Sequence, residues 1–392
     1  MKKIILIKYG ELTTKKANRN LFVNKLYNNI VLKLKDYKVK IVKNRVRMFI
    51  DVEEDNIDDI INILKKIFGI HRIVVAYQVN TNIDDIKNGV MDIVKNLDFD
   101  TFKVETKRSD KNFPISSMEF NNIIGGLILK NVPNKKVNVH NPDYLLRIEI
   151  REDYTYIYSK EIEGAGGYPV GVAGQGLLMI SGGIDSPVAG YMAMKRGIKL
   201  ECIYFESPPH TSIMAKNKVK SLIKQLSNYQ GNIVLHIVNF TEIQEAIYKY
   251  CDPDYMITIM RRMMYRISER VMDKYKDLIL INGESIGQVA SQTLNSMQVI
   301  NNVTNRPVIR PLACFDKLEI IDISKKIGTY DISILPYEDC CTIFLPKHPV
   351  INPTLEKAIA CENKFDYEIL IDRAISNMEN IKINNEDEKF EI

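Results

Sequence analysis

The first 68 residues alternate between strand-like and helix-like spacing of apolar side chains. Residues 3–8 form a short apolar run that is typical of a strand. Residues 17–35 and 56–68 carry apolar residues three and four positions apart, which is the spacing of one buried helix face. Residues 38–42 and 46–52 alternate apolar and polar residues, as strands with one solvent-facing side do. The pattern predicts a small α+β unit that ends near Phe68.

A second α+β unit is predicted from about residue 70 to residue 164. Its expected elements are strands at 72–79, 101–106, 137–140 and 145–158 and helices at 82–96 and 117–130. The last strand segment alternates cleanly enough to form a hairpin. The glycine-rich stretch 163–176 follows, and such composition marks a loop or flexible joint. We therefore place the main domain boundary in this stretch.

From Leu177 the pattern becomes near-continuous apolar strands separated by helices. Strands are predicted at 177–180, 199–205, 233–240 and 278–285, with helices beginning near Ser186 and at 212–228 and 255–274. Strands that are apolar on both sides indicate a parallel sheet covered by helices on both faces. The expected organisation is thus 1–58, 59–164, a linker at 165–176, and an α/β domain at 177–392.

Composition supports a soluble multidomain protein. The 392 residues are 45% hydrophobic and 26% charged, and this length predicts two or three domains. No run of about 18 apolar residues exists, and the N-terminal apolar run stops at Lys8, too early for a signal peptide. A cytoplasmic protein that does not engage membranes is expected.

Positive charge gathers at the N-terminus. Residues 1–50 hold 14 Lys or Arg against two Asp or Glu, a net charge of +12, whereas the rest of the chain sums to −7. A basic arm on a near-neutral body favours a polyanionic partner, with nucleic acid first. A solvated lysine-rich face is the alternative that charge alone leaves open.

The cysteines do not indicate a disulfide framework or a zinc site. None of the six forms a CxxC pair, and no export signal is present. Most are expected to be buried thiols. The adjacent pair at 340–341 is the exception. The six are Cys202, Cys251, Cys314, Cys340, Cys341 and Cys361.

The segment SGGIDSP at 181–187 carries the clearest chemistry. A buried strand leads into Ser181, Gly182 and Gly183, and a helix begins near Ser186, so backbone N–H groups and the helix N-terminus can surround an anion. Asp185 would repel phosphate unless a cation lay between them, which suggests that it holds Mg²⁺. Neither GxxxxGK[ST] nor GxGxxG is present. A glycine turn with a helix cap is the alternative.

These residues resemble the pyrophosphate-binding loop of the ATP pyrophosphatases (PP-loop enzymes), which cleave ATP between the α and β phosphates and adenylate a substrate. Segments 108–126 and 146–158 resemble the THUMP RNA-binding domain. Segments 167–197, 281–294 and 310–333 resemble the ThiI family of tRNA 4-thiouridine synthetases. The resemblance covers essentially the whole chain. It implies a ferredoxin-like unit at 1–58, a THUMP domain at 59–164 and a PP-loop domain at 177–392.

The resemblance also implies a set of nucleotide-binding residues. Arg261 could instead pair with a carboxylate, as could its neighbour Arg262. The strand residues Met179, Ile180, Tyr204 and Phe205 could equally be ordinary core. The full set is Met179, Ile180, Ser181, Gly182, Gly183, Asp185, Ser186, Tyr204, Phe205, Arg261, Gly283 and Gln292.

Three residues are implied to be catalytic: Asp185, Lys317 and Cys340. A fixed ammonium at Lys317 would stabilise charge that grows at the α-phosphate, whereas an exposed lysine starting a helix is the alternative. Asp316 is expected to cap that helix. A thiolate at Cys340 could accept sulfur or resolve a disulfide, with Cys341 and two structural cysteines as alternatives. Asp339 would raise a neighbouring thiol pKa.

The implied reaction is thiolation of uridine 8 of tRNA. ATP and Mg²⁺ would adenylate uridine O4, and sulfur from a persulfide or sulfide would then expel AMP. The rhodanese domain of some relatives is absent, so sulfur is expected from a cysteine desulfurase, a separate carrier or free sulfide. This absence weakens any link to thiamine biosynthesis. A homodimer fits the resemblance.

Two rival functions stay open. One is adenylation of another tRNA base or of a small molecule, although a tRNA-independent substrate would leave the basic arm without a role. The other is a non-catalytic tRNA-binding module, against which the intact loop and Lys317 count. Phe113 is considered as a base-stacking residue, but a core position is the favoured interpretation.

Overall fold

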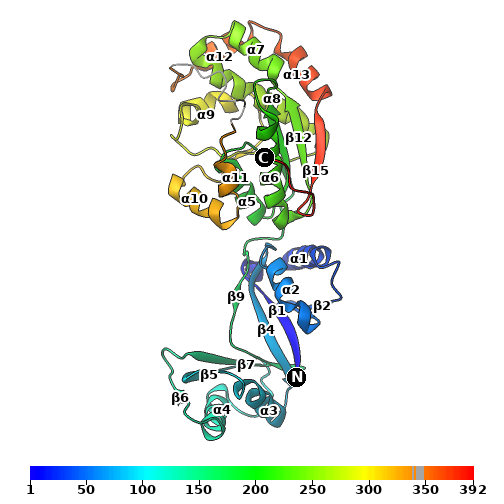
Figure 1. Ribbon diagram of the computed structural model, residues 1–392, viewed down its shortest axis with the longest axis vertical. Coiled ribbons are helices and arrows are strands. Elements are labelled where there is room, and N and C mark those ends of the chain that lie inside the picture. Colours follow the sequence, from blue (N-terminus) through cyan, green and yellow to red (C-terminus); the bar gives the residue numbers. More distant parts are fainter. Residues whose placement is uncertain (338–339, 341–347) are drawn as a thin grey trace. The chain divides into compact units, whose positions relative to one another are not determined.

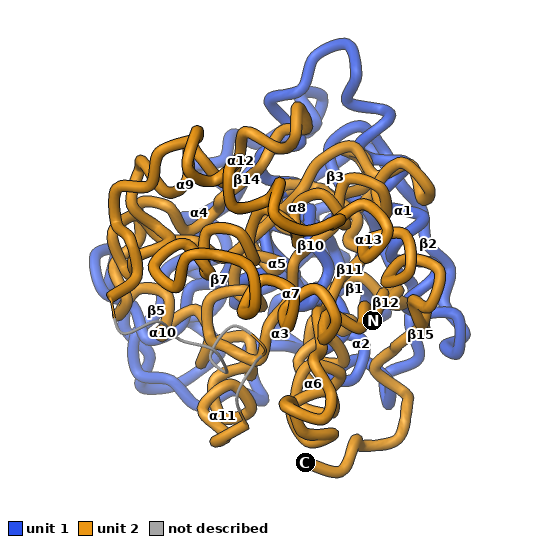
Figure 2. The backbone as a smooth tube through the Cα atoms, turned by 90° about the horizontal axis from the view of Figure 1, so that it is seen from above, with its two compact units in different colours: residues 1–167 blue, residues 168–392 orange. Residues whose placement is uncertain are grey.

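The structure is a computed structural model that describes residues 1–337, 340 and 348–392. It divides into two compact units, Met1–Gly167 (unit 1) and Tyr168–Ile392 (unit 2), which Figure 2 shows in different colours. In the described part of the chain, no helix is long and apolar enough to cross a membrane.

Unit 1 begins with a three-stranded antiparallel arrangement in the order β2–β3–β1. Apolar residues of β1, such as Ile5 and Leu6, are fully buried, as the short apolar run predicted. The elements here are β1 (Lys2–Tyr9), η1 (Glu11–Thr14), α1 (Arg19–Lys33), β2 (Lys40–Lys43), β3 (Arg47–Asp51), η2 (Glu54–Asn56) and α2 (Ile57–Leu64).

The long strand β4 (Ile70–Asn80) extends this sheet into the second part of unit 1. It pairs antiparallel with β1 on one side and with β8 and β9 on the other, so one sheet runs through both predicted small domains. β7 and β8 form the predicted antiparallel hairpin, and β5 is parallel to β6 and β7. The elements are α3 (Ile83–Val94), β5 (Thr101–Arg108), α4 (Ser117–Asn131), β6 (Lys136–Val137), β7 (Tyr144–Ile150), β8 (Tyr154–Tyr158) and β9 (Ile162–Glu163).

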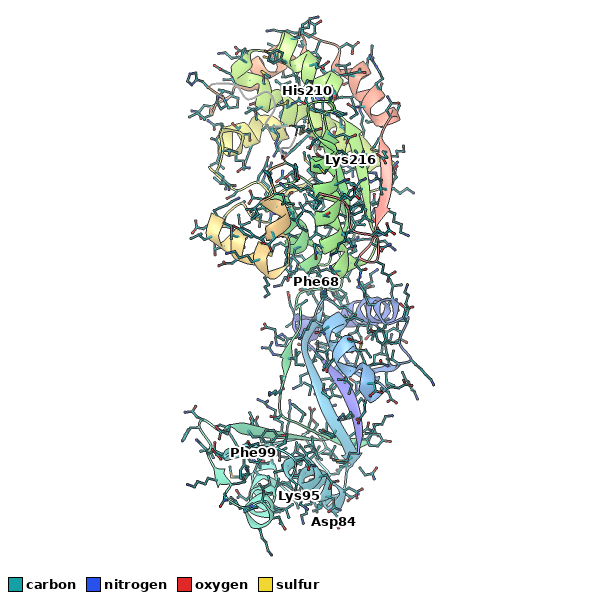
Figure 3. The ribbon with its side chains drawn as sticks, viewed as in Figure 1. Phe68, Asp84, Lys95, Phe99, His210 and Lys216 are labelled. Atoms are coloured by element: carbon teal, nitrogen blue, oxygen red, sulfur yellow. The ribbon has the colours of Figure 1, made fainter. Side chains whose placement is uncertain are left out.

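The core beneath α3 and α4 combines aliphatic side chains with packed aromatic rings. Phe113 is buried and meets Phe120 edge to face with ring centroids 5.4 Å apart. The core position favoured for Phe113 is therefore confirmed, and the stacking role is not available to a side chain that is 5% exposed. The ring of Phe99, which Figure 3 labels, stacks on Tyr144 at the edge of the same core.

Unit 2 is built on a sheet in the order β14–β13–β10–β11–β12–β15. Figure 1 labels its last two strands, β12 and β15. The pairs from β14 to β12 are parallel, as predicted. The edge strand β15 is antiparallel, which the sequence did not reveal. Lys216 of α6, labelled in Figure 3, fastens it by pairing with Glu379 at 2.9 Å and with Glu206 at 3.4 Å. The strands are β10 (Gln175–Met179), β11 (Lys199–Glu206), β12 (Ile233–Asn239), β13 (Ile279–Ile281), β14 (Val308–Ile309) and β15 (Glu379–Ile383).

Helices cover both faces of this sheet, as two-sided apolar strands require. On one face Leu178 of β10 packs against α5 and α6. On the other, Leu177 and Met179 join a core with α7, α8, α9, α12 and α13. The helices are α5 (Asp185–Lys195), α6 (Ile213–Gln230), α7 (Thr241–Tyr250), η3 (Pro253–Tyr255), α8 (Met256–Tyr275), η4 (Ala290–Gln292), α9 (Leu294–Asn301), α10 (Lys317–Lys326), α11 (Tyr330–Ser333), α12 (Leu355–Glu362) and α13 (Tyr367–Ser376).

Candidate active site

A cavity lies in unit 2 where the carboxyl ends of β10, β11 and β13 meet α8. This is the edge at which parallel sheets of this kind bind ligands. Met264 adds to the apolar side of its wall, whereas Asn282 and Glu284 add polar groups. Ten of the twelve residues expected to bind nucleotide line it: Met179, Ile180, Ser181, Asp185, Ser186, Tyr204, Phe205, Arg261, Gly283 and Gln292.

The two sides of the cavity suit the two ends of a nucleotide. Met179 and Phe205 belong to the buried core of unit 2, and they also present an apolar wall at the strand ends. A core position and a place in the cavity wall are therefore compatible for these strand residues. The serines and charged side chains of the wall suit phosphates, since anions are held by hydroxyls, amides and cations.

The loop after β10 folds around the hydroxyl of Ser186. The backbone N–H of Ser181 donates to Ser186 Oγ at 2.9 Å, and the two serine hydroxyls are 3.1 Å apart. The backbone N–H of Gly183 points to Ser181 Oγ at 3.3 Å. Gly182 and Gly183 do not line the cavity, and their contact with a nucleotide stays a prediction. The loop thus holds a compact form at the start of α5.

Gly283 has a steric role at this loop. A Cβ atom there would lie 2.7 Å from the backbone carbon of Asp185 and 2.7 Å from the backbone nitrogen of Ser186. Both atoms belong to the backbone at the start of α5, so they cannot move aside as a flexible side chain would. Glycine therefore allows the segment after β13 to pack closely against the loop at 181–186, which is called the phosphate loop below.

Asp185 and Lys317 meet although 132 residues separate them. Lys317 Nζ lies 2.6 Å from Asp185 Oδ1. Lys317 begins α10, whose start is fixed by a capping box between Asp316 and Glu319, so the expected cap is confirmed. The ammonium stands beside the first turn of α5, next to Asp185, which lines the cavity. Its side chain is 43% exposed and can reorganise when a ligand enters.

A buried carboxylate organises the cationic wall. Glu284 is 2% exposed and binds Arg261 at 2.5 Å and Arg310 at 2.7 Å. Burial alone would raise the pKa of Glu284, but the two arginine charges outweigh it and hold that pKa below its usual value. Arg261 therefore combines both alternatives, because it pairs with a carboxylate and lines the cavity. Its neighbour Arg262 pairs with the buried Glu362 instead.

Cys340 reaches the same cavity. It is buried, although it was excepted from the expectation of buried thiols. That expectation is confirmed for Cys202, Cys251 and Cys361, whereas Cys314 is exposed. Cys341 and Asp339, the alternative sulfur carrier and the charge expected beside it, lie outside the described residues. The structure therefore brings all three residues expected to be catalytic to one region of unit 2.

The acidic groups present fit Mg²⁺ better than a metal caged by protein alone. Within the described residues, no group of three or more His, Cys, Asp or Glu side chains could hold a metal ion. Mg²⁺ that travels with a nucleotide needs one or two carboxylates, because phosphates and water supply the other ligands. Asp185, in the first turn of α5 at the phosphate loop, meets that requirement.

Unit 1 contains a separate cationic groove. Its basic residues come from the start of α1 and from the β2–β3 turn, and asparagines lie between them. Lys43 Nζ donates to Asn24 Oδ1 at 2.7 Å and stands over the ring of Tyr27. Four of the 14 basic residues at 1–50 thus line one groove. The basic residues of this groove are Lys16, Arg19, Lys43 and Arg45.

Comparison with known families agrees with this architecture. Residues 4–74 match the ThiI ferredoxin-like domain and residues 80–160 match the THUMP domain. The fold and the site therefore define a protein in which a THUMP domain precedes a PP-loop domain. Residues 171–367 match the family described as thiamine biosynthesis protein (ThiI). This chain belongs to the ThiI family.

Individual relatives are similar to this chain over nearly its whole length. A protein of Thermoanaerobacter sp. (strain X514) named "Probable tRNA sulfurtransferase" is 50% identical over 373 residues, which cover 95% of this chain and 98% of that one. A protein of the same name from Geobacillus sp. (strain WCH70) is 49% identical over 382 residues. The similar region covers 97% of this chain and 95% of the Geobacillus protein. A crystal structure of a 4-thiouridine synthetase–RNA complex with bound ATP is 36% identical with a TM-score of 0.90, covering 98% of this chain and 100% of that one.

Proposed function

We propose that this chain is an ATP-dependent tRNA sulfurtransferase that converts uridine 8 of tRNA to 4-thiouridine. The observation that carries the proposal is one cavity lined by residues of the phosphate loop, among them Asp185, and by Cys340, with the Lys317 ammonium paired to Asp185 at its edge. Adenylation needs the loop and the ion pair, and sulfur transfer from a persulfide needs the thiol. The similar protein in complex with RNA and ATP supports the same substrates.

The first step activates a poor leaving group. Uridine O4 attacks the α-phosphorus of ATP, the bond to the β-phosphate oxygen breaks, and pyrophosphate leaves. Loop amides at 181–186 and the Lys317 ammonium stabilise the negative charge that moves onto phosphate oxygens. Mg²⁺ held by Asp185 and phosphate would add further neutralising charge. The product is an adenylated uridine with AMP as its leaving group.

The second step places sulfur on C4. Sulfide can attack C4 directly, expel AMP and lose its proton, so it needs no protein thiol. A donor persulfide attacks C4 with its terminal sulfur, expels AMP, loses its proton and leaves a donor–S–S–C4 linkage. The Cys340 thiolate then attacks the donor sulfur, 4-thiouridine departs with its own sulfur, and an external thiol reduces the mixed disulfide. The donor is a cysteine desulfurase or a separate carrier.

Unit 1 is assigned to tRNA binding. Its cationic groove offers Lys16, Arg19, Lys43 and Arg45 to phosphates, and the THUMP part would recognise the shape of folded RNA. Phosphate contacts of this kind orient a nucleic acid without reading its bases. They would direct one uridine to the cavity of unit 2.

Mass spectrometry of nucleosides tests the proposal. Unmodified tRNA is incubated with the protein, ATP, Mg²⁺ and either sulfide or cysteine with a cysteine desulfurase. We expect 4-thiouridine that disappears without ATP and in Asp185→Ala. Bound tRNA that yields no thiouridine from either sulfur source would exclude thiolation and favour another modified base.

A further inference from the structure

The segment that leads to Cys340 is held by a buried lysine from a distant helix. Lys218 of α6 is 4% exposed, and its ammonium donates to the backbone carbonyl of Leu335 at 2.7 Å and to that of Tyr337 at 3.4 Å. Burying a lysine is costly unless its charge is satisfied. Two carbonyls of this segment therefore serve as its partners, and the segment and helix α6 constrain each other.

A second buried side chain acts at the cysteine itself. Gln244 of α7 is 1% exposed, and its Nε2 donates to the backbone carbonyl of Cys340 at 2.7 Å. The same Nε2 also lies 3.6 Å from Met260 Sδ in α8, so the amide is fixed against the core. One side of Cys340 is thus bonded to α7, while the residue lines the cavity.

The near end of the segment touches the phosphate loop. Ser333, the last residue of α11, directs its hydroxyl to the backbone carbonyl of Gly183 at 3.3 Å. The described residues between α11 and Cys340 are therefore tied to the phosphate loop at the start, to α6 in the middle and to α7 at the cysteine. These ties connect the sulfur chemistry to the loop that holds the nucleotide.

We propose that Lys218 and Gln244 are positioning residues for the sulfur-transfer step. This inference rests on the proposed function and assigns a role to two residues that do not line the cavity. Their buried donors fix the main chain at Leu335, Tyr337 and Cys340, so that the thiol stands at the cavity wall when a donor persulfide has reacted. Without Gln244 the carbonyl of the buried Cys340 loses this partner, and without Lys218 the carbonyls of the half-buried Leu335 and Tyr337 lose theirs, so the segment shifts to recover them.

The test separates the two sulfur sources, because only the persulfide route uses the thiol. Gln244→Met keeps the side-chain length and Lys218→Met shortens it by one atom, and both remove the donor. We expect each to lower desulfurase-supported 4-thiouridine formation by about 10- to 100-fold, the scale of a misplaced reacting group, with the sulfide-supported rate and tRNA-dependent pyrophosphate release retained. Lys218→Arg keeps a cationic donor and should restore much of the loss.

Gln230→Met is the matched control. Gln230 also donates its Nε2 to a backbone carbonyl, that of Leu200 at 2.8 Å, but it lies at the opposite end of α6 and should leave both rates unchanged. Cys340→Ser is run in parallel to report on the thiol itself.

Three outcomes would overturn the inference. A loss shared equally by both sulfur sources would mean that the residues only support the fold. A normal desulfurase-supported rate in both variants, with Cys340→Ser defective, would remove their positioning role and leave the proposed function intact. A normal Cys340→Ser enzyme would remove the thiol from the route, while pyrophosphate release would still report on adenylation. If Lys218→Met fails to fold, Gln244→Met decides alone.

Discussion

Gly283 is the residue whose replacement should damage the site most specifically. In Gly283→Ala the new methyl group would meet backbone atoms of Asp185 and Ser186 at 2.7 Å. Because neither atom can move freely, we expect weaker ATP binding and a free energy of unfolding lowered by about 1–3 kcal/mol, as overpacking usually costs. Isothermal titration with ATP and thermal denaturation measure the two effects.

The control for this change is Gly126→Ala. Gly126 lies in the exposed middle of α4, where an added Cβ would meet nothing within 4 Å. Alanine there should leave ATP binding unchanged and add slightly to stability, since glycine is a poor helix former. Normal ATP binding by Gly283→Ala would show that the loop tolerates displacement, contrary to the role given to this glycine.

Lys317 is expected to act on the reaction and hardly on the fold. Its ion pair with Asp185 is partly exposed, and such pairs contribute little to stability. Lys317→Ala should therefore melt normally, whereas tRNA-dependent pyrophosphate release should fall by about 10²–10³-fold, the usual cost of a lost transition-state contact. Lys326→Ala, an exposed lysine of the same helix, is the matched control. Equal activity of the two variants would remove Lys317 from the mechanism.

For individual residues, the sequence was most informative where the residues of a motif are close together in the chain. The loop 181–186 and the strand-end residues were predicted because they are close together in the chain and have a recognisable pattern. Glu284 was missed, since a glutamate after a short strand has no signal of its own and its partners Arg261 and Arg310 lie 23 and 26 residues away. Only folding shows that it organises the cationic wall.

The connection between α8 and β13 carries an unusual buried acid. Asp277 is fully buried at the end of the sheet opposite the cavity, and burial, with the nearby charge of Glu201 adding to it, raises its pKa to about 6. Its unfolded value is about 3.9. Between these values the folded state binds more protons, so this group lowers the free energy of unfolding as pH rises from about 4 to about 6.

Asp277→Asn removes that titration. The variant should gain stability over the natural protein as pH rises, reaching a gain of about 1–3 kcal/mol by pH 7, the equivalent of roughly two pKa units at most. Urea denaturation of both proteins from pH 4 to pH 8 gives the difference. A gain that is independent of pH, or a loss at pH 7, would contradict the raised pKa.

Among whole elements, those with strong periodicity were predicted and those with weak signals were not. The buried strands and the long helices lie close to the expected residues. α7 was not predicted, because ten mixed residues between two stronger elements give a short pattern. β15 was also missed. Its alternation is brief and its pairing with β12 depends on a return of the chain from more than 140 residues away.

At the scale of the whole molecule, the uneven charge should appear in tRNA affinity. Replacing Lys16, Lys43 and Arg45 together by glutamine removes three exposed cations from the groove of unit 1. We expect weaker tRNA binding and a slope of log affinity against log salt that is shallower by about 2–3, because fewer counterions are displaced. Filter binding at several salt concentrations measures this slope.

A charge-matched control replaces three exposed lysines of unit 2 by glutamine: Lys364, Lys382 and Lys389. These changes alter the net charge equally but lie outside the groove. Equal effects of the two triple variants would mean that net charge alone, and no particular surface, attracts the tRNA. The general prediction of a basic arm came from the sequence, whereas the groove that brings four of its basic residues together required the fold.

The central claim is that the cavity of unit 2 adenylates uridine 8 before sulfur arrives. The most direct measurement counts AMP and pyrophosphate against 4-thiouridine, using two tRNA transcripts that carry either uridine or cytidine at position 8. We predict one AMP and one pyrophosphate for each 4-thiouridine with the uridine transcript, and none of these products above background with the cytidine transcript. Release of ADP and phosphate, or thiouridine formed in the cytidine transcript, would contradict the account.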